Sequence, residues 1–384
     1  MGLLAQEYQN RLESIRQAMS EQGIDALLVY SWKRGAVRYV SGYYPGYVAN
    51  VALVVVPREG DPTLLIRFPF DLARAHRMSW IADIRASGDW AGLARDCKTI
   101  LSAWGVACGR LGLVGGDASV DEMPHSLHQL LCESLLDAES VPGVAILDRL
   151  RLKKSPAERA LMARSAQVAD AAMQAAVQAF APGRSEFDVA AAAEGTARAM
   201  GAENSLFVIA PAGKQLIGPP EDRRIEPDEM AVLEFAVQVD GYWTQVPRVF
   251  HTGVPTPEQR EMYGVAHRAY LAGVGAARPG TSVADVAKAE LGVLEKAGWL
   301  SWLEYDLGHG DGLDHPEIPA ITPTSEARVE AGMALCIHPG LDKPGVGGVF
   351  VGGTVLIEED RTTPLHRFPA TLTEGIGRSQ GAGA

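Results

Sequence analysis

The stretch Val232–Phe250, VLEFAVQVDGYWTQVPRVF, decides the fold. Two runs rich in β-branched and aromatic residues lie on either side of Asp240-Gly241. Such runs are typical of β-strands, and an Asp-Gly pair between them is typical of a type I′ turn. The stretch therefore predicts a β-hairpin whose register is set by its turn.

Two polar side chains fall on one face of this hairpin. With the turn as reference, Val239 should pair with Tyr242, and Ala236 with Gln245. Glu234 then lies diagonal to Gln245 on the same face. A carboxylate and an amide inside apolar strands need a partner side chain, a ligand or a metal to satisfy them. We therefore expect the functional site to be built on this hairpin.

Composition restricts the class of protein and its partners. The chain has 384 residues, of which 47% are hydrophobic and 21% charged, so it is an ordinary globular sequence long enough for two domains. The formal net charge is −12 and the isoelectric point is about 5.3. A net negative charge gives no positive electrostatic potential to attract nucleic acid or an anionic membrane, so we expect neither as a partner.

The cysteines and the N-terminal residues indicate in which cellular compartment the protein is found. The four cysteines form no CxxC pair and have no metal-ligand spacing, so they indicate reduced thiols. Residues 1–19 predict a charged amphipathic helix rather than a signal peptide, and no apolar run reaches the length of about 18 residues that spans a membrane. We therefore expect a cytoplasmic protein.

Strand and helix patterns alternate over residues 1–150, which predicts an α/β domain. Apolar runs predict strands at residues 26–30, 51–56, 63–66 and 111–114, and helical spacing precedes the first of these and covers residues 93–104.

A second domain is expected over residues 151–384. Ser155, Pro156 and Glu158 form a capping box that opens a long helix through about residue 180, and Thr256 with Pro257 opens another to about residue 277. A further helix is predicted over residues 283–297, and strands at 206–209, 334–337 and 354–357, besides the hairpin. Helices gathered before and between antiparallel strands predict an α+β layer.

The order of these motifs carries a resemblance to a known family. After the capping box and the hairpin come Leu307-Gly308-His309-Gly310, Gly332-Met333 with His338-Pro339-Gly340, and Gly347-Gly348-Val349. This order resembles the creatinase, prolidase and aminopeptidase P superfamily, whose catalytic domain has the pita-bread fold. Tyr39-Val40-Ser41-Gly42 resembles the N-terminal domain of that family. The resemblance implies an α/β N-terminal domain, a pita-bread catalytic domain and a homodimer that acts on a small-molecule substrate.

The family's metallopeptidases bind two metal ions through two Asp, one His and two Glu. The resemblance places these ligands at Glu234, Gln245, His309, His338 and Gly352. Only the histidine is unchanged, and two dications need bridging carboxylates that an amide and a glycine do not supply. We therefore expect no two-metal Xaa-Pro dipeptidase, and no metal or cofactor at all.

This loss of ligands resembles the metal-independent branch of the family, of which creatinase is the known example. The function predicted from it is metal-independent hydrolysis of a C–N bond, of amide, amidine or guanidino type, in a small polar nitrogen compound. Creatine itself is not expected, because Ile217 or Gly218 stands where creatinase has its acid/base histidine.

The predicted catalytic residues are three histidines and the polar pair of the hairpin. His309 and His338 would share acid/base duty, and Glu234 would raise the pKa of one of them and fix its tautomer. Gln245 or His315 would stabilise the tetrahedral oxyanion.

Six further residues are predicted to contact substrate: Arg248, Asp311, Tyr47, Asn50, Arg67 and Tyr242. Guanidinium groups suit a carboxylate or another anion, and a carboxylate suits a cation. The resemblance implies that the loop with Tyr47 and Asn50 reaches the active site of a neighbouring subunit. Each of three residues has an alternative role: Arg248 could pair with other groups of the protein, Asp311 could be a solvated acid in a loop, and Tyr47 could pack in a subunit interface.

Three other functions stay open. A mononuclear metalloenzyme could use His309, His338 and Glu234, a two-histidine, one-carboxylate set. A lyase or decarboxylase would use the same histidines to abstract a proton, and a non-catalytic protein would keep the fold only for binding. Metal content separates the first of these from the others.

Overall fold

The computed structural model describes residues 5–32, 35–48, 50–115, 123–211 and 216–376. The chain divides into two compact units, Met1–Arg151 and Leu152–Ala384. The first unit is α/β and the second is α+β, so the predicted fold class is confirmed. No helix among these described residues is long and apolar enough to cross a membrane.

The first unit is built on a mixed β-sheet. Its described strands pair in the order β4-β3-β2-β1-β5-β6, with β1 antiparallel to β2 and parallel to β5. The strands are β1 Ala26–Ser31, β2 Ala52–Pro57, β3 Thr63–Ile66, β4 Asp83–Ala86, β5 Arg110–Val114 and β6 Glu139–Pro142. Every residue of β1, β2 and β3 is buried, which explains why these strands are continuous apolar runs.

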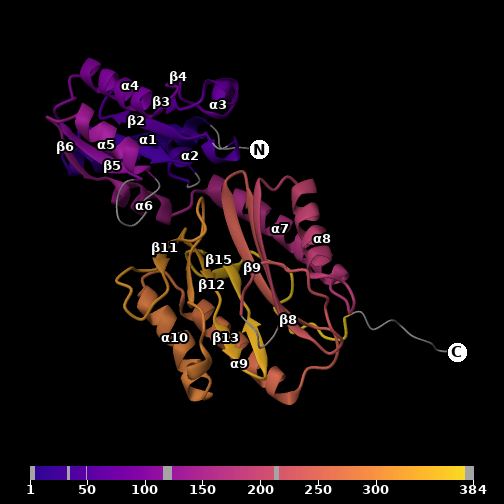
Figure 1. Ribbon diagram of the computed structural model, residues 1–384. Helices are drawn as coiled ribbons and strands as arrows, with labels where there is room; N and C mark the ends of the chain where they lie inside the picture. The colour runs from indigo at the N-terminus through magenta and orange to yellow at the C-terminus, as the bar shows by residue number, and fades with distance from the viewer. Residues whose placement is uncertain (1–4, 33–34, 49, 116–122, 212–215, 377–384) are drawn as a thin grey trace. The chain divides into compact units, whose positions relative to one another are not determined.

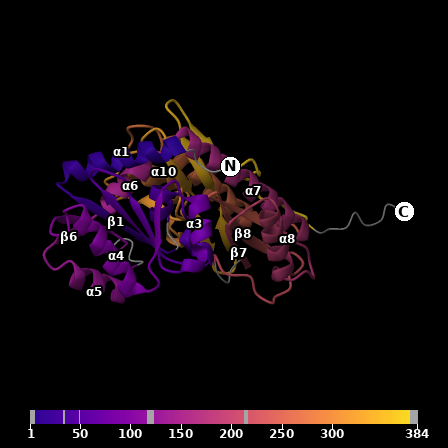
Figure 2. The same ribbon diagram turned by 90° about the horizontal axis from the view of Figure 1, so that it is seen from above.

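Helices cover both faces of this sheet. Figure 2 shows α1 and α6 on one side of it and α4 and α5 on the other. The buried leucines of α4 and α5 pack with β1 and β5 in one apolar core. The helical segments are α1 Ala5–Glu21, α2 Ala36–Ser41, α3 Leu72–Met78, α4 Trp90–Ala103, α5 His125–Ser134 and α6 Val144–Leu152, with short 3₁₀ turns η1 Pro45–Val48 and η2 Pro69–Asp71.

The predicted hairpin forms the centre of the second unit. Strands β8 Met230–Val239 and β9 Tyr242–His251 pair in the predicted register, and β7 Asn204–Pro211 adds to the other edge of β8. Asp240 and Gly241 have φ of 47° and 93°, and two positive φ values are the mark of the type I′ turn.

Helices pack on both faces of this three-stranded sheet (Figure 1). Helices α7 Pro156–Ala179 and α8 Glu186–Ala199 cover one face, and each begins with a capping box, at Ser155 and Ser185. Helix α9 Pro257–Ala276 packs on the other face with β14, and α10 Val283–Lys296 packs against α9. The hairpin is therefore buried on both sides, so its polar side chains lie inside the protein.

A second sheet brings the histidine motifs to the hairpin. Its described strands pair in the order β11-β10-β12-β15-β16. They are β10 Gly308–Gly310, β11 Glu317–Ala320, β12 Ala334–Ile337, β15 Gly353–Ile357 and β16 Thr362–Pro364, and nearby lie the strand pair β13 Gly340–Lys343 and β14 Gly347–Phe350 and the 3₁₀ turn η3 Leu300–Trp302. Strand β9 meets β15 where the backbone N–H of Gln245 donates to Thr354 Oγ1 over 2.9 Å. The end of β12 and the middle of β10 thus lie beside the polar face of the hairpin.

Candidate functional site

Three histidines meet at the junction of the two sheets. His309 lies in β10, His338 follows β12, and His315 lies in the loop after β10. The ring centroid of His309 is 5.1 Å from that of His338 and 5.1 Å from that of His315. His309 is 7% exposed, His338 is fully buried and the side chain of His315 is 12% exposed, so the three predicted histidines form one largely buried cluster.

The polar pair of the hairpin extends this cluster. Gln245 Nε2 donates to Glu234 Oε1, and Gln245 Oε1 accepts from Cys336 Sγ at 3.1 Å. The expected diagonal contact therefore exists, and both ends of the Gln245 amide are occupied by protein groups. Burial raises the pKa of Glu234 to about 7, against the opposing effects of His315 and the Gln245 hydrogen bond.

Asp311 holds His315 in place. Its Oδ2 accepts from Thr354 Oγ1 at 2.7 Å, and its Oδ1 lies 3.4 Å from Nδ1 of His315. The His315 ring also stacks on Trp243, with centroids 5.7 Å apart. Burial lowers the pKa of His315, but the hydrogen bond and charge of Asp311 outweigh it, so this pKa is raised. Asp311 is fully buried and acts on a histidine, so it is not a solvated loop acid.

His338 is buried without hydrogen bonds to its ring nitrogens in the described part of the chain. Neither of its ring nitrogens has a hydrogen-bond partner among the described residues, although Nδ1 lies 3.6 Å from Asp306 Oδ1. Burial and the neighbouring His309 lower its pKa well below the ordinary value. A buried imidazole without a partner is costly, so this position suits a ligand to a metal or a contact to substrate.

The expected Glu–His dyad is not formed. Among the described residues, Glu234 hydrogen-bonds Gln245 and no histidine. The pKa of His338 falls rather than rises, because burial has a larger effect on it than any nearby carboxylate. The family resemblance predicted that Glu234 and His338 lie near each other. It could not show that the Gln245 amide would donate its hydrogen bond to the Glu234 carboxylate.

A single metal ion fits the cluster. One ligand atom each from His309, Cys336 and His338 lie within 4.8 Å of one another. Two imidazoles and a thiolate form a nitrogen and sulfur set of the kind that Zn²⁺ favours. Sequence reasoning missed Cys336, although its place two residues before His338 on a strand already put both side chains on one face.

Two metal ions do not fit. Gln245 replaces one family ligand, and its oxygen already accepts from Cys336. At Gly352, which replaces another, an added Cβ would lie 2.0 Å from the backbone oxygen of Ile337. Backbone atoms thus fill the space that a side chain at residue 352 would need. The chain lacks both the bridging carboxylates and the space for two divalent ions.

Two of the residues predicted to contact substrate have structural partners. Arg248 donates to four backbone oxygens, of Pro247, Gly352, Phe368 and Pro369. The hydroxyl of Tyr242 donates to Glu158 Oε1 at 2.8 Å. The structure thus gives both side chains partners within the protein, which agrees with the structural alternative for Arg248, and their contact with substrate stays a prediction.

Three of the predicted contacts, Tyr47, Asn50 and Arg67, lie in the first unit. Asn50 is fully buried, and its Oδ1 accepts from the backbone N–H groups of Val51 and Phe68. Arg67 stacks over Trp90, 4.1 Å from the ring centroid. Tyr47 lies in η1, and its side chain is outside the described part of the chain. Asn50 and Arg67 thus have local structural partners.

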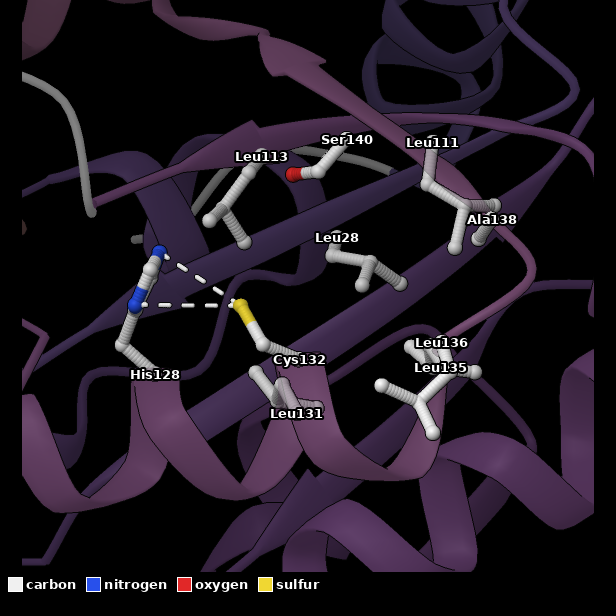
Figure 3. Close-up of a pocket in the computed structure, with 10 residues that line it drawn as sticks. All are labelled: Leu28, Leu111, Leu113, His128, Leu131, Cys132, Leu135, Leu136, Ala138 and Ser140. Atoms are coloured by element: carbon white, nitrogen blue, oxygen red, sulfur yellow. Dashed lines mark hydrogen bonds between the residues drawn. The ribbon is translucent and has the colours of Figure 1, made fainter.

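The first unit also contains an apolar cavity of about 210 Å³. Figure 3 shows leucines pointing into it and, at one side, Cys132 Sγ within 3.9 and 4.0 Å of the two ring nitrogens of His128. Its lining includes no carboxylate or guanidinium group. Since catalysis needs converging polar groups, the histidine cluster is the better candidate active site.

Comparison with known proteins agrees with the fold. Residues 160–359 match the family model described as metallopeptidase family M24, and residues 11–153 match the creatinase/prolidase N-terminal domain. The structure of a prolidase from Pyrococcus horikoshii OT3 has a TM-score of 0.84 at 23% identity, covering 94% of this chain and 99% of that one.

Curated relatives are named as peptidases. An uncharacterized peptidase, YqhT, of Bacillus subtilis is 26% identical over 367 residues, which is 94% of this chain and 99% of the relative. An Xaa-Pro dipeptidase of Pyrococcus furiosus is 30% identical over 231 residues, which is 59% of this chain and 66% of the relative.

These relatives contradict the function predicted from the sequence. That prediction was a metal-independent, creatinase-like hydrolase of C–N bonds other than peptide bonds, whereas the relatives are named peptidases and dipeptidases, which act on peptide bonds. The prediction went wrong because it preferred the metal-independent branch once the two-metal ligands were missing; the single-metal alternative was kept open, but with Glu234 as its third ligand and without Cys336.

Proposed function

Because the chain belongs to metallopeptidase family M24, we propose that it is a hydrolase that cleaves the peptide bond of a dipeptide-sized substrate with the help of one metal ion. The observation that carries the proposal is the buried cluster of His309, Cys336 and His338, whose ligand atoms lie within 4.8 Å of one another. The relatives named Xaa-Pro dipeptidase support the choice of bond and the size of substrate.

In this proposal the metal ion would activate water and the substrate, and neighbouring protein groups would hold its ligands in place. A bound divalent ion lowers the pKa of water and polarises a carbonyl. His309 is oriented for binding because its Nδ1 lies 2.8 Å from the backbone oxygen of Gly310, which leaves Nε2 as the ligand atom. Without a metal, the Cys336 thiol donates to Gln245 Oε1, and this hydrogen bond would be lost when the thiolate binds a metal.

Two side chains beside the ligands can move protons and stabilise charge. Glu234 is a buried carboxyl whose pKa of about 7 suits a general base that accepts a proton from water and returns it to the leaving amine. His315 is oriented by Asp311 and can donate a hydrogen bond to the oxyanion that forms at the attacked carbonyl. Asp311 and Gln245 act as positioning residues.

Metal content and peptide hydrolysis test the proposal together. We expect plasma mass spectrometry of the dialysed protein to find about one metal per chain, and we expect the loaded protein to cleave members of a dipeptide panel that includes Xaa-Pro sequences. His338→Ala should lose the metal, whereas His128→Ala, which removes an imidazole outside the cluster, should keep it. Two metals per chain, or none, would contradict the single-metal site, and a loaded protein that cleaves no dipeptide would contradict the hydrolase.

We also propose that the protein is cytoplasmic, as its cysteine usage indicates, and that it is a homodimer, as the family resemblance implies. Sedimentation equilibrium measures the mass, for which the chain of 41.0 kDa is the monomer reference. A monomer at micromolar concentration would rule out the dimer without affecting the metal site.

A further inference from the structure

A second cavity lies in the second unit beside β9, where helix α9, the start of β15 and the segment after β16 meet. Its volume is about 280 Å³. Gln245 points to the histidine cluster, and Arg248, three residues along the strand, points to the opposite face and lines this cavity. The remaining walls come from helix α9, the start of β15 and the segment after β16, and include His267, Tyr270, His366 and Arg367.

Arg248 brings a buried positive charge to this cavity. It is 3% exposed, and among the described residues it forms no ion pair with a carboxylate. It donates to the four backbone oxygens of Pro247, Gly352, Phe368 and Pro369. A guanidinium has five N–H donors, so one donor is left over. The exposed side chain of Arg367 adds a second positive charge at the same cavity.

His366 brings a buried acceptor. Its side chain is 2% exposed, and its Nδ1 lies 3.2 Å from Asp170 Oδ1. An ionised carboxylate can only accept, so Nδ1 carries the proton and Nε2 of the neutral ring carries a lone pair. This Nε2 is buried without a hydrogen-bond partner among the described residues. The backbone N–H of Arg367 also donates to Asp170, at 2.6 Å, which holds the carboxylate in this orientation.

We infer that this cavity binds an oxyanion that keeps an O–H group at neutral pH, as inorganic phosphate does. The anion balances the charges of Arg248 and Arg367 and accepts the remaining N–H of Arg248, while its O–H donates to Nε2 of His366. Sulfate has nearly the same shape and charge but no O–H at neutral pH, so it leaves Nε2 unsatisfied. None of the proposed metal ligands lines this cavity, so anion binding can be measured apart from metal binding and peptide hydrolysis; Thr354 lies between the two sites, because it lines the cavity and donates to Asp311.

Calorimetric titration of the full chain with phosphate and with sulfate tests the inference. At pH 8 and constant ionic strength, we expect saturable binding of phosphate and binding of sulfate weaker by about ten-fold or more, since an unsatisfied buried acceptor costs that much. Arg367→Ala should weaken phosphate binding by about three- to ten-fold, because an exposed charge contributes modestly. Arg361→Ala, which removes an exposed charge outside the lining, is the matched control and should leave affinity unchanged.

His366→Phe removes the acceptor and should lower phosphate affinity to the level of sulfate. Should this variant fold poorly, the comparison of the two anions on the unaltered protein still decides the role of His366. Equal affinity for phosphate and sulfate would overturn that role. Absence of phosphate binding at about 100-fold the chain concentration, or equal losses in Arg367→Ala and Arg361→Ala, would overturn the site itself.

Discussion

Cys336 distinguishes this cluster from a cage of carboxylates. A thiolate is a soft ligand, so its presence beside two imidazoles favours Zn²⁺ or Co²⁺ over the hard cations that carboxylates favour. Burial raises the pKa of the Cys336 thiol well above its ordinary value, so the thiol holds its proton until a cation displaces it. Metal binding at this site should therefore release a proton.

Replacement of this cysteine gives a spectroscopic prediction. The protein loaded with Co²⁺ should show a thiolate-to-cobalt charge-transfer band in the near ultraviolet, and Cys336→Ser should lose that band because serine supplies no sulfur ligand. Cys108→Ser removes an exposed thiol and is the control that should keep the band. A band that survives in Cys336→Ser would show that sulfur does not bind the metal.

Glu234 gives a prediction for activity. If it is the general base, kcat/KM of the loaded protein should rise with pH as this carboxyl loses its proton, at or below the pKa of about 7 that burial gives it without a metal. Glu234→Gln should lower kcat by about 10²- to 10⁴-fold and remove this rise, with metal content unchanged. A variant that keeps the same pH profile would assign the rise to another group, and loss of metal would make Glu234 a ligand.

At the scale of elements, the sequence predicted the features that depend only on residues close together in the chain. The turn at Asp240-Gly241 fixed the register of the hairpin, and the capping boxes fixed the starts of α7 and α9, because each depends on residues close in sequence. The meeting of His309, His315 and His338 followed from the family order of motifs. Apart from the neighbouring Pro247, the partners of Arg248 and Tyr242 were not predictable, because they lie 84 to 121 residues away in the chain.

The packing of α9 against α10 buries a carboxyl group that is unsatisfied among the described residues, which the sequence did not reveal. Glu290 of α10 is fully buried, and its carboxyl oxygens have no hydrogen-bond partner among the described residues. It lies against Gly273 of α9, where an added Cβ would be 2.8 Å from its side chain. Burial raises the pKa of Glu290 well above the ordinary value.

This carboxyl predicts how stability depends on pH. Above the unfolded pKa of 4.5, the unfolded state loses the Glu290 proton while the folded state keeps it, so the free energy of unfolding falls as pH rises toward the folded pKa. The slope from this group is at most about 1.4 kcal/mol per pH unit. Urea unfolding of Glu290→Gln at pH 5 to 8 should lack that contribution and gain stability relative to the original protein at the higher pH. A slope unchanged in the variant would mean that Glu290 ionises normally in the folded state.

At the scale of the whole molecule, the two units have separate cores, and the proposed metal ligands all belong to the second. A ligand that binds only the folded state stabilises the part that it binds, by mass action. Zn²⁺ should therefore raise the melting temperature of the second unit and leave a transition that belongs to the first unit in place. Differential scanning calorimetry with and without Zn²⁺ measures this, and His338→Ala should abolish the shift. If both transitions move together, the two units unfold cooperatively, whereas a shift of the first unit alone would place the metal outside the histidine cluster.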